Sequence, residues 1–258
     1  MRLQEKVLFV TGAASGMGRA AAQVCAGYGA KIIAADLNLE GAQETVDQII
    51  AAGGDGIAVK VNTTNRSDVA AAVQAGVEKY GKINCLFNNA GICQSSFLVD
   101  CDDDLYDKIM NVNVKGAYIV ATELAKHMKE NGQGRIISTS SISALKEEST
   151  NGFYCMSKSA VLVMTRNLAL ELSQYGVTAV CICPGHIDTP LLKGSFIQRG
   201  AAEGKSVDEY YAEMEKTIPM GRLAQPEEIG ELVAFLCDDR SAYINGNSIL
   251  VTGGKVME

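Results

Sequence analysis

The feature that most constrains this chain is a regular alternation of short apolar runs with longer segments of helical spacing. Residues 6–11 and 31–36 are apolar runs, and the segments 17–30 and 39–52 that follow them repeat apolar residues three and four positions apart. The alternation continues with apolar runs at 56–61, 84–91, 134–141, 178–185 and 247–254, and with helical segments at 67–80, 103–131, 154–175 and 226–237. Neighbouring parallel strands need crossover connections, so this order predicts a doubly wound α/β fold with helices on both faces of one parallel sheet.

The chain has 258 residues, which a single α/β sheet can accommodate, and no repeat or Pro-rich linker divides it. We therefore expect one domain over residues 1–258. Residues 186–217 are too polar and too rich in Gly for a sheet element, and too long for an ordinary connection. This segment is a candidate lid over a substrate site.

The charge and cysteine patterns exclude several classes of function. The net charge is −7 and Lys and Arg form no cluster, which argues against a nucleic-acid partner. No apolar run approaches the roughly 20 residues that cross a bilayer, and no secretory signal is recognisable, so we expect a cytoplasmic protein without a membrane partner. The 8 cysteines are scattered without a CxxC pair, and only 2 histidines accompany them, so no metal site is expected.

A glycine-rich turn, TGAASGMG at 11–18, stands between the first strand and the first helix. Its glycines permit a tight turn and let the backbone approach a pyrophosphate at the helix N-terminus. A plain structural turn is the alternative, but the position directly after the first strand favours a dinucleotide. A nucleoside-triphosphate loop would require Gly-Lys-Ser/Thr, which is missing here.

Asp36 ends the second strand, 18 residues after Gly18. An acidic side chain there can accept hydrogen bonds from an adenosine ribose and would repel a 2′-phosphate. Leu37, Ala14 and Ser15 offer no cation to offset that repulsion, so the pattern favours NAD over NADP. The alternative is that Asp36 caps the next helix.

Tyr154 and Lys158 are four residues apart in a helical segment, so both side chains lie on one helix face. A nearby cation favours the tyrosinate and lowers the pKa of the phenol, which suits proton transfer. The spacing alone is common, and a solvated helix face is the alternative interpretation.

Six motifs occur in the order and spacing of the classical short-chain dehydrogenase/reductase family: TGAASGMG at 11–18, NNAG at 88–91, the asparagine of MNVNVKG at 113, STSS at 138–141, YCMSK at 154–158 and PGHIDTP at 184–190. The chain resembles this family over essentially its whole length. The resemblance implies a Rossmann-type fold and an oxidoreductase that transfers hydride to or from a nicotinamide cofactor.

The resemblance assigns four catalytic roles. Ser141 would hydrogen-bond the substrate oxygen, and Tyr154 would be the acid/base. Lys158 would lower the pKa of that tyrosine and hold the nicotinamide ribose, and Asn113 would support a water relay to the lysine.

The turn, the second strand and the resemblance together predict an NAD site. Its expected residues are Gly12, Ser15, Gly16, Met17, Gly18, Asp36, Leu37, Asn62, Thr63, Asn89, Ala90, Gly91, Tyr154, Lys158, Ile187 and Thr189. Asn62 departs from the family pattern, which has Asp at this position, although an amide can still bond the adenine edge.

The expected function is the NAD-dependent interconversion of a secondary alcohol and a ketone. The lid contributes apolar side chains at Leu191, Leu192, Phe196, Ile197, Tyr210, Tyr211 and Met214, with cations dispersed at Lys193, Arg199, Lys205 and Lys216. A medium-sized apolar substrate, a hydroxysteroid or a cyclic alcohol, is therefore favoured over a sugar phosphate, although helix packing could explain the same residues. His186 either faces this substrate or is an ordinary loop histidine.

Two other functions stay open. A 3-oxoacyl-thioester reductase of fatty-acid synthesis would share every motif, but Asp36 weighs against it because reductive biosynthesis usually draws on NADPH. A non-catalytic NAD-sensing protein could keep the glycine turn, but it would not need the tyrosine and lysine together.

The helix from residue 154 is apolar around much of its circumference, at Val161, Leu162, Val163, Met164, Leu168, Leu170 and Leu172. Such a helix needs a partner besides its own sheet. In the family this helix and the one containing Asn113 pair across a two-fold axis, so we expect a homotetramer.

Overall fold

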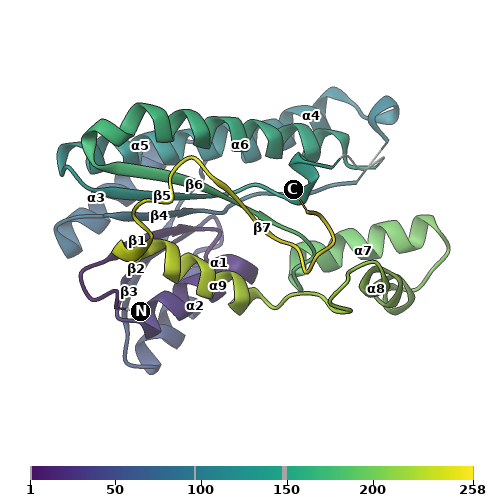
Figure 1. The fold of residues 1–258 in the computed structure, drawn as a ribbon, viewed down its shortest axis with the longest axis horizontal. Helices are drawn as coiled ribbons and strands as arrows, with labels where there is room; N and C mark the ends of the chain where they lie inside the picture. Colours follow the sequence, from purple (N-terminus) through teal and green to yellow (C-terminus); the bar gives the residue numbers. More distant parts are fainter. Residues whose placement is uncertain (1, 96, 147–149, 258) are drawn as a thin grey trace.

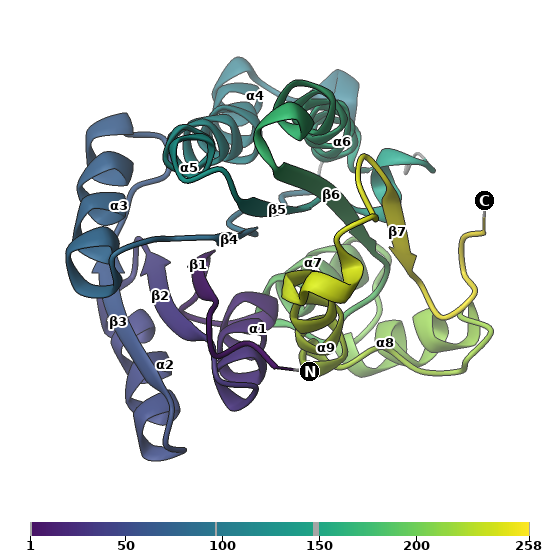
Figure 2. The ribbon, with the colours of Figure 1, turned by 60° about the vertical axis from the view of Figure 1, so that its left-hand side comes forward.

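The strands build one parallel sheet of seven, in the order β3-β2-β1-β4-β5-β6-β7, in a computed structural model that describes residues 2–257 apart from 96 and 147–149. The strands are β1 (Val7–Thr11), β2 (Lys31–Asp36), β3 (Asp55–Lys60), β4 (Cys85–Asn88), β5 (Gly134–Thr139), β6 (Val177–Pro184) and β7 (Ser248–Val251). Figure 2 shows them side by side in this order. The doubly wound, Rossmann-type fold predicted from the alternation is confirmed.

The strand order reverses between β1 and β4, which pair with Phe9 opposite Leu86. From β1 the chain winds outward through β2 to β3, and from β4 it winds the other way to β7. At such a reversal the connections leave the carboxyl ends of the two central strands in opposite directions, and a crevice opens between them. The glycine turn follows β1, and the NNAG motif begins in β4, so both lie at this crevice.

Helices cover both faces of the sheet (Figure 1). One face carries α1 (Gly16–Gly27), α2 (Leu39–Ala51) and α9 (Pro226–Cys237), whose apolar residues share a core with the strands. The other face carries α3 (Arg66–Tyr80), α5 (Ala117–Glu130) and α6 (Gly152–Leu172) around a second core. Because both faces are covered, β1 is buried along its whole length.

The segment 103–131, expected as one helical stretch, is broken into three parts. Helix α4 (Asp103–Met110) is followed by a π-helical turn over Asn111–Gly116 and then by α5. A π turn inserts an extra residue into the helical ladder and is frequent at functional sites. Asn113 lies in this turn and is 1% exposed.

The segment 186–217 contains two helices, α7 (Pro190–Ala202) and α8 (Val207–Lys216), which lie beyond the sheet in Figure 1. Ser206 and Glu209 form a capping box that begins α8. Phe196 and Tyr210 pack together in a small apolar cluster that also includes Ile218 and Leu223, just beyond this segment. The capping box and this cluster therefore hold the segment in place.

The two ends of this excursion meet in a backbone bridge between Ile187 and Ala224. Asp188 donates its N–H to the carbonyl oxygen of Ala224 at 2.9 Å, and Ala224 donates to His186 at 3.0 Å. No helix within the described part of the chain is long and apolar enough to cross a membrane.

Among the described residues, four short 3-10 turns lie at Leu98–Asp100, Ile142–Ala144, Ser173–Tyr175 and Asp239–Ser241.

Candidate active site

The glycine turn folds tightly over the N-terminus of α1. Gly12 and Gly16 have positive φ angles of 70° and 53°, a region that side chains rarely adopt. A Cβ atom on Gly18 would lie 2.0 Å from the carbonyl oxygen of Gly12, so only glycine lets the helix pack against the turn. Ser15 is the N-cap of α1, and the unpaired N–H groups of the first helical turn suit an anionic pyrophosphate.

Asp36 is held by the backbone around the same turn. Its carboxylate accepts hydrogen bonds from the N–H of Ala14 at 3.0 Å and of Asn38 at 2.9 Å. The N-cap of α2 is Asn38, so the interpretation of Asp36 as that helix's cap is wrong. Leu37 is 64% exposed.

Arg19, in the first helix, lies near this acid but is engaged elsewhere. Its guanidinium donates to the carbonyl oxygen of Ala14 at 2.6 Å and to Glu44 at 2.9 Å. Glu44 therefore competes for this guanidinium with any anion bound near the glycine turn.

A cavity of about 330 Å³ lies at the carboxyl ends of β1, β2 and β4. It is lined by most of the residues expected to bind the cofactor: Gly12, Ser15, Gly16, Met17, Asp36, Leu37, Asn62, Thr63, Asn89, Ala90, Gly91 and Thr189. Gly18 lies behind the turn instead, and Ile187 faces the neighbouring cavity described below. The Oδ1 atom of Asn62 accepts from Thr64 at 3.1 Å, which leaves its NH₂ group to donate.

Hydrogen bonds across β1 and β4 fix the floor of this cavity. The hydroxyl of Thr11 accepts from the backbone N–H groups of Asn89 and Ala90, at 2.9 and 3.0 Å. The side chain of Asn89 also donates to the carbonyl oxygen of Thr11 at 3.2 Å. The glycine turn and the NNAG segment are thereby held together as one surface.

A second cavity, of about 110 Å³, is lined by three of the four predicted catalytic residues. Ser141, at the end of β5, and Tyr154 and Lys158, on α6, line it together with Ile187 and Thr189. Met17, Asn89, Gly91 and Thr189 line both cavities, so the two adjoin. The serine, tyrosine and lysine therefore lie next to the cavity expected to hold the dinucleotide.

Lys158 is 4% exposed, and its Nζ atom lies 5.6 Å from the centre of the Tyr154 ring. It donates a hydrogen bond to the carbonyl oxygen of Thr139 at 2.9 Å. Burial lowers the pKa of this lysine to about 8, because desolvation disfavours the charged form. Ser141 is oriented by Ser143, whose N–H donates to the Ser141 hydroxyl at 3.1 Å.

Asn113 lies behind the lysine rather than in the cavity wall. Its side chain accepts from the N–H of Ile92 at 2.8 Å and donates to the Ile92 carbonyl oxygen at 2.9 Å and to Ser157 at 3.0 Å. A Cβ atom on Gly91 would lie 3.2 Å from the Asn113 amide oxygen and 3.4 Å from the Nζ atom of Lys158. The asparagine thus positions the loop after β4 against α6, and the water relay stays a prediction.

Sequence reasoning missed part of the catalytic cavity. Cys93, Asn151, Ser195 and Arg199 also line it, and no motif or spacing distinguishes them. Of the apolar lid residues, Leu191, Leu192 and Phe196 line this cavity. Ile197 is 51% exposed and is not part of its wall.

The described residues contain no group of three His, Cys, Asp or Glu side chains placed to hold a metal ion.

The chain is similar to known proteins over most of its length. A family model described as enoyl-(acyl carrier protein) reductase matches residues 12–255. Oxidoreductase UcpA of Escherichia coli (strain K12) is 34% identical, over 99% of this chain and 96% of that protein. L-rhamnose 1-dehydrogenase (NAD(P)(+)) of Azotobacter vinelandii is 36% identical over 98% of each. Cyclohexanol dehydrogenase of Acinetobacter sp. (strain SE19) is 34% identical, over 98% of this chain and 95% of that protein.

Solved structures show the same likeness. The crystal structure of levodione reductase superposes with a TM-score of 0.94 at 29% identity, covering 98% of both chains. The 3-ketoacyl-(acyl-carrier-protein) reductase of Brucella melitensis, solved in complex with NADH, superposes with a TM-score of 0.87 at 32% identity, over 98% of this chain and 99% of that chain.

Proposed function

Because the chain belongs to the classical short-chain dehydrogenase/reductase family, we propose that it is an NAD-dependent enzyme that interconverts a secondary alcohol and a ketone. The observation that carries this proposal is that the two cavities adjoin. Ser141, Tyr154 and Lys158 share one wall with Thr189, which also faces the dinucleotide site. A substrate oxygen at the serine and tyrosine would therefore lie beside a bound nicotinamide.

The proposed chemistry divides between the cofactor and the side chains. When bound, a nicotinamide would supply the hydride acceptor for the carbinol carbon in oxidation and the hydride donor in reduction. Tyr154 takes the hydroxyl proton in oxidation and gives it back in reduction. The ammonium of Lys158 stabilises the negative charge that the tyrosine acquires, and the hydroxyl of Ser141 donates a hydrogen bond to the substrate oxygen.

We propose a medium-sized substrate with a largely apolar body, such as a hydroxysteroid or a cyclic alcohol. Ile142, Leu192 and Phe196 supply apolar surface to the catalytic cavity. The cyclohexanol dehydrogenase among the relatives supports this class of substrate. The L-rhamnose dehydrogenase among them is a reason to test polyols as well.

A 3-oxoacyl-thioester reductase is the second candidate, favoured by the description of the matching family model and by the 3-ketoacyl reductase structure. A non-catalytic NAD-sensing role is a weaker alternative, since it would not need the tyrosine, lysine and serine that line one cavity. Turnover of free secondary alcohols would support the first function, and turnover of 3-oxoacyl thioesters would support the second. Turnover of neither would support the non-catalytic role.

The proposal is tested with purified protein and a panel of secondary alcohols, ketones and 3-oxoacyl thioesters, followed at 340 nm with NAD(H) and NADP(H). The Tyr154→Phe variant should lose nearly all turnover and still bind NADH, because it lacks the proton donor but keeps Lys158. EDTA should leave the rate unchanged. Substantial activity in Tyr154→Phe would show that the acid/base is another residue.

A further inference from the structure

The dinucleotide cavity extends to the point where β3 ends, at one edge of the described sheet. β3 pairs with β2, with Lys60 opposite Asp36. Val61 and Asn62 follow directly and line the same cavity as Asp36. The catalytic residues lie beyond β1 and β4 in the strand order, after β5 and on α6. A dinucleotide with its adenosine ribose at Asp36 and its nicotinamide near Ser141 would therefore place its purine at Asn62.

Both acceptor positions of the Asn62 side chain are used within its own turn. Its Oδ1 atom accepts from the backbone N–H of Thr64 at 3.1 Å and from the Thr64 hydroxyl at 2.8 Å. A backbone N–H can only donate, so the atom that faces it is the amide oxygen and not the nitrogen. An amide oxygen has two lone pairs, and Thr64 engages both. Any hydrogen bond from this side chain to a bound purine is therefore donated by its NH₂ group.

The residues around Asn62 leave this donor as the polar side chain that meets the purine. A Cβ atom on Gly116 would lie 2.7 Å from the hydroxyl oxygen of Thr63, so that hydroxyl lies against the π-helical turn. The carboxylate of Asp68 accepts from the backbone N–H of Asn62 at 3.3 Å, and Asp68 is not among the described residues that line the cavity. Apolar side chains complete this part of the wall, at Val61, Ile92 and Val112.

Purines differ in the edge that such a donor would meet. Adenine presents an amino group, which donates, beside a ring nitrogen, which accepts. An asparagine pairs fully with that edge only when its oxygen and its nitrogen both take part. A 6-oxo purine presents an oxygen in place of the amino group, and side chains that only donate pair with this oxygen. The amide of Asn62 therefore suits a 6-oxo purine better than it suits adenine.

We propose that Asn62 lets the cofactor site accept a 6-oxo purine, so that nicotinamide hypoxanthine dinucleotide binds as well as NAD. This inference rests on the NAD-dependent function proposed above and specifies which base its dinucleotide can carry. The NH₂ group of Asn62 donates to the purine O6 atom. The ribose at Asp36 and the nicotinamide are the same in both dinucleotides, so the other contacts of the site are unchanged.

The test is a fluorescence titration of the purified protein with NADH and with reduced nicotinamide hypoxanthine dinucleotide, which carry the same fluorescent dihydronicotinamide. The unmodified protein should bind the hypoxanthine form within about threefold of NADH or more tightly, because Asn62 is exposed and a single hydrogen bond to an exposed group contributes little.

Asn62→Asp should reverse the polarity of this contact. One carboxylate oxygen can stay with Thr64 while the other accepts from the amino group of adenine and repels the O6 atom of hypoxanthine. The ratio of the two dissociation constants should therefore shift by about tenfold in favour of NADH.

Asn65→Asp is the matched control, because it adds the same charge to the same turn. Asn65 is the N-cap of α3, where aspartate serves as well as asparagine, and it is not among the described residues that line the dinucleotide cavity. This variant should keep the ratio of the unmodified protein, because the two dinucleotides carry the same charge.

Tighter binding of NADH by more than about threefold in the unmodified protein, or an Asn62→Asp ratio that does not move toward NADH, overturns the proposal while the NAD site itself stands. If the protein binds neither dinucleotide, the proposed function fails and this inference falls with it.

Discussion

At the scale of single residues, Asp36 is the side chain on which cofactor choice depends. Its carboxylate lies at the ribose end of the dinucleotide cavity, and the exposed Leu37 beside it supplies no compensating cation. We expect kcat/KM to be higher with NAD than with NADP. Asp36→Ala combined with Leu37→Arg should reverse the preference, because it replaces the repelling charge with a donor for the 2′-phosphate. Equal kcat/KM for the two cofactors in the unmodified enzyme would contradict this prediction.

Lys158 is expected to lower the stability of the folded protein. Its pKa falls from 10.5 in the unfolded chain to about 8 in the folded one, because burial disfavours the ammonium. Below pH 8 Lys158 is protonated in both the folded and the unfolded chain, so the folded state is destabilised by the full cost of burying the ammonium. Between pH 8 and 10.5 the unfolded state binds more protons, so this contribution to stability rises with pH.

Lys158→Met should therefore abolish turnover and raise the free energy of unfolding at pH 7 by about 1–3 kcal/mol. Urea unfolding at pH 7 and pH 10 measures both proteins, and their difference should shrink at the higher pH. A less stable Lys158→Met at pH 7, or a difference that grows with pH, would refute the assignment of a desolvated ammonium.

The sequence predicted the residues that ordered motifs specify and missed those that the fold alone brings together. Ser141, Tyr154 and Lys158 meet in one cavity as expected, because a strand end and one helix face position them. Arg199 and Asn151 line that cavity from separate segments, and no local spacing in the sequence indicates that they lie close together. Dispersed cations along the sequence therefore gave no sign that Arg199 would face the catalytic cavity.

At the scale of elements, apolar runs located all seven strands of the described sheet to within a few residues, because buried parallel strands are short and continuously apolar. The break in the segment 103–131 was missed, since the π turn depends on bonds from Asn113 to Ile92 and Ser157 that the helical pattern does not encode. Helix packing was considered for the lid, but the bounds of its two helices were not predicted, although the capping box at Ser206 could have been found.

The contact between the glycine turn and α1 leads to a further prediction. Gly18→Ala should weaken NADH binding by more than about tenfold, because its Cβ atom would collide with backbone that cannot move aside cheaply. Gly27→Ala, at the other end of α1, is the control, since a Cβ atom there meets nothing within 4 Å. NADH fluorescence titration should show native affinity for the control, and native affinity for Gly18→Ala would disprove the close approach.

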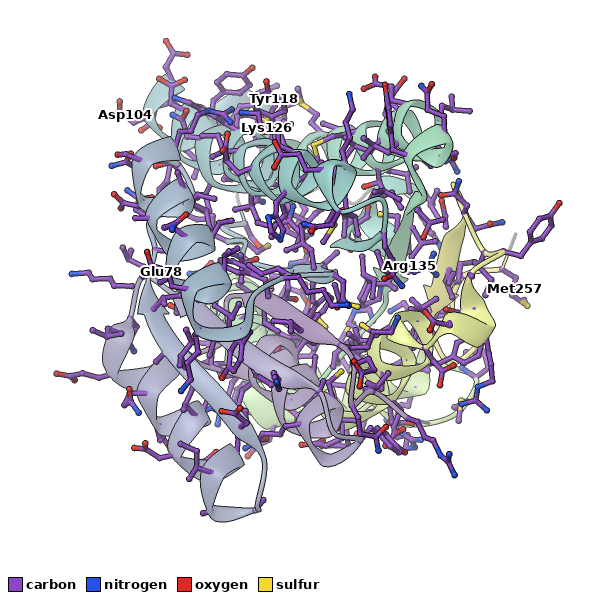
Figure 3. The ribbon with its side chains drawn as sticks, turned by 90° about the vertical axis from the view of Figure 1, so that its left-hand side faces the viewer. Glu78, Asp104, Tyr118, Lys126, Arg135 and Met257 are labelled. Atoms are coloured by element: carbon purple, nitrogen blue, oxygen red, sulfur yellow. The ribbon has the colours of Figure 1, made fainter. Side chains whose placement is uncertain are left out.

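At the scale of the whole molecule, α6 leaves apolar side chains uncovered. Leu170 is 80% exposed and Val163 is 55% exposed, whereas Val161 and Leu168 on the same helix are buried. Tyr118 lies on the outer side of the neighbouring α5 (Figure 3) and is 49% exposed. We propose that this surface pairs with a second copy of the chain in a homotetramer.

Light scattering at micromolar concentration should give four times the mass of one chain. Leu170→Glu together with Val163→Glu should lower that mass, because two charges would be buried in the contact. Ile50→Glu, a change at a 54% exposed residue on α2, should leave it unchanged. A monomeric unmodified protein would refute the proposal.

Ile187 and Ala224 pair at the base of the lid, so the part of the molecule that faces the substrate can be treated as an exchangeable structural unit. Ile187 and Ala224 are joined by backbone hydrogen bonds, and Phe196 and Tyr210 give the intervening residues a core of their own. A relative's segment of different length could replace the residues after Leu191 and before Ala224, so that Thr189, Pro190 and Leu191 stay in the wall of the dinucleotide cavity. In such a chimaera the choice of substrate would travel with the graft, and proton and hydride transfer would stay with the host.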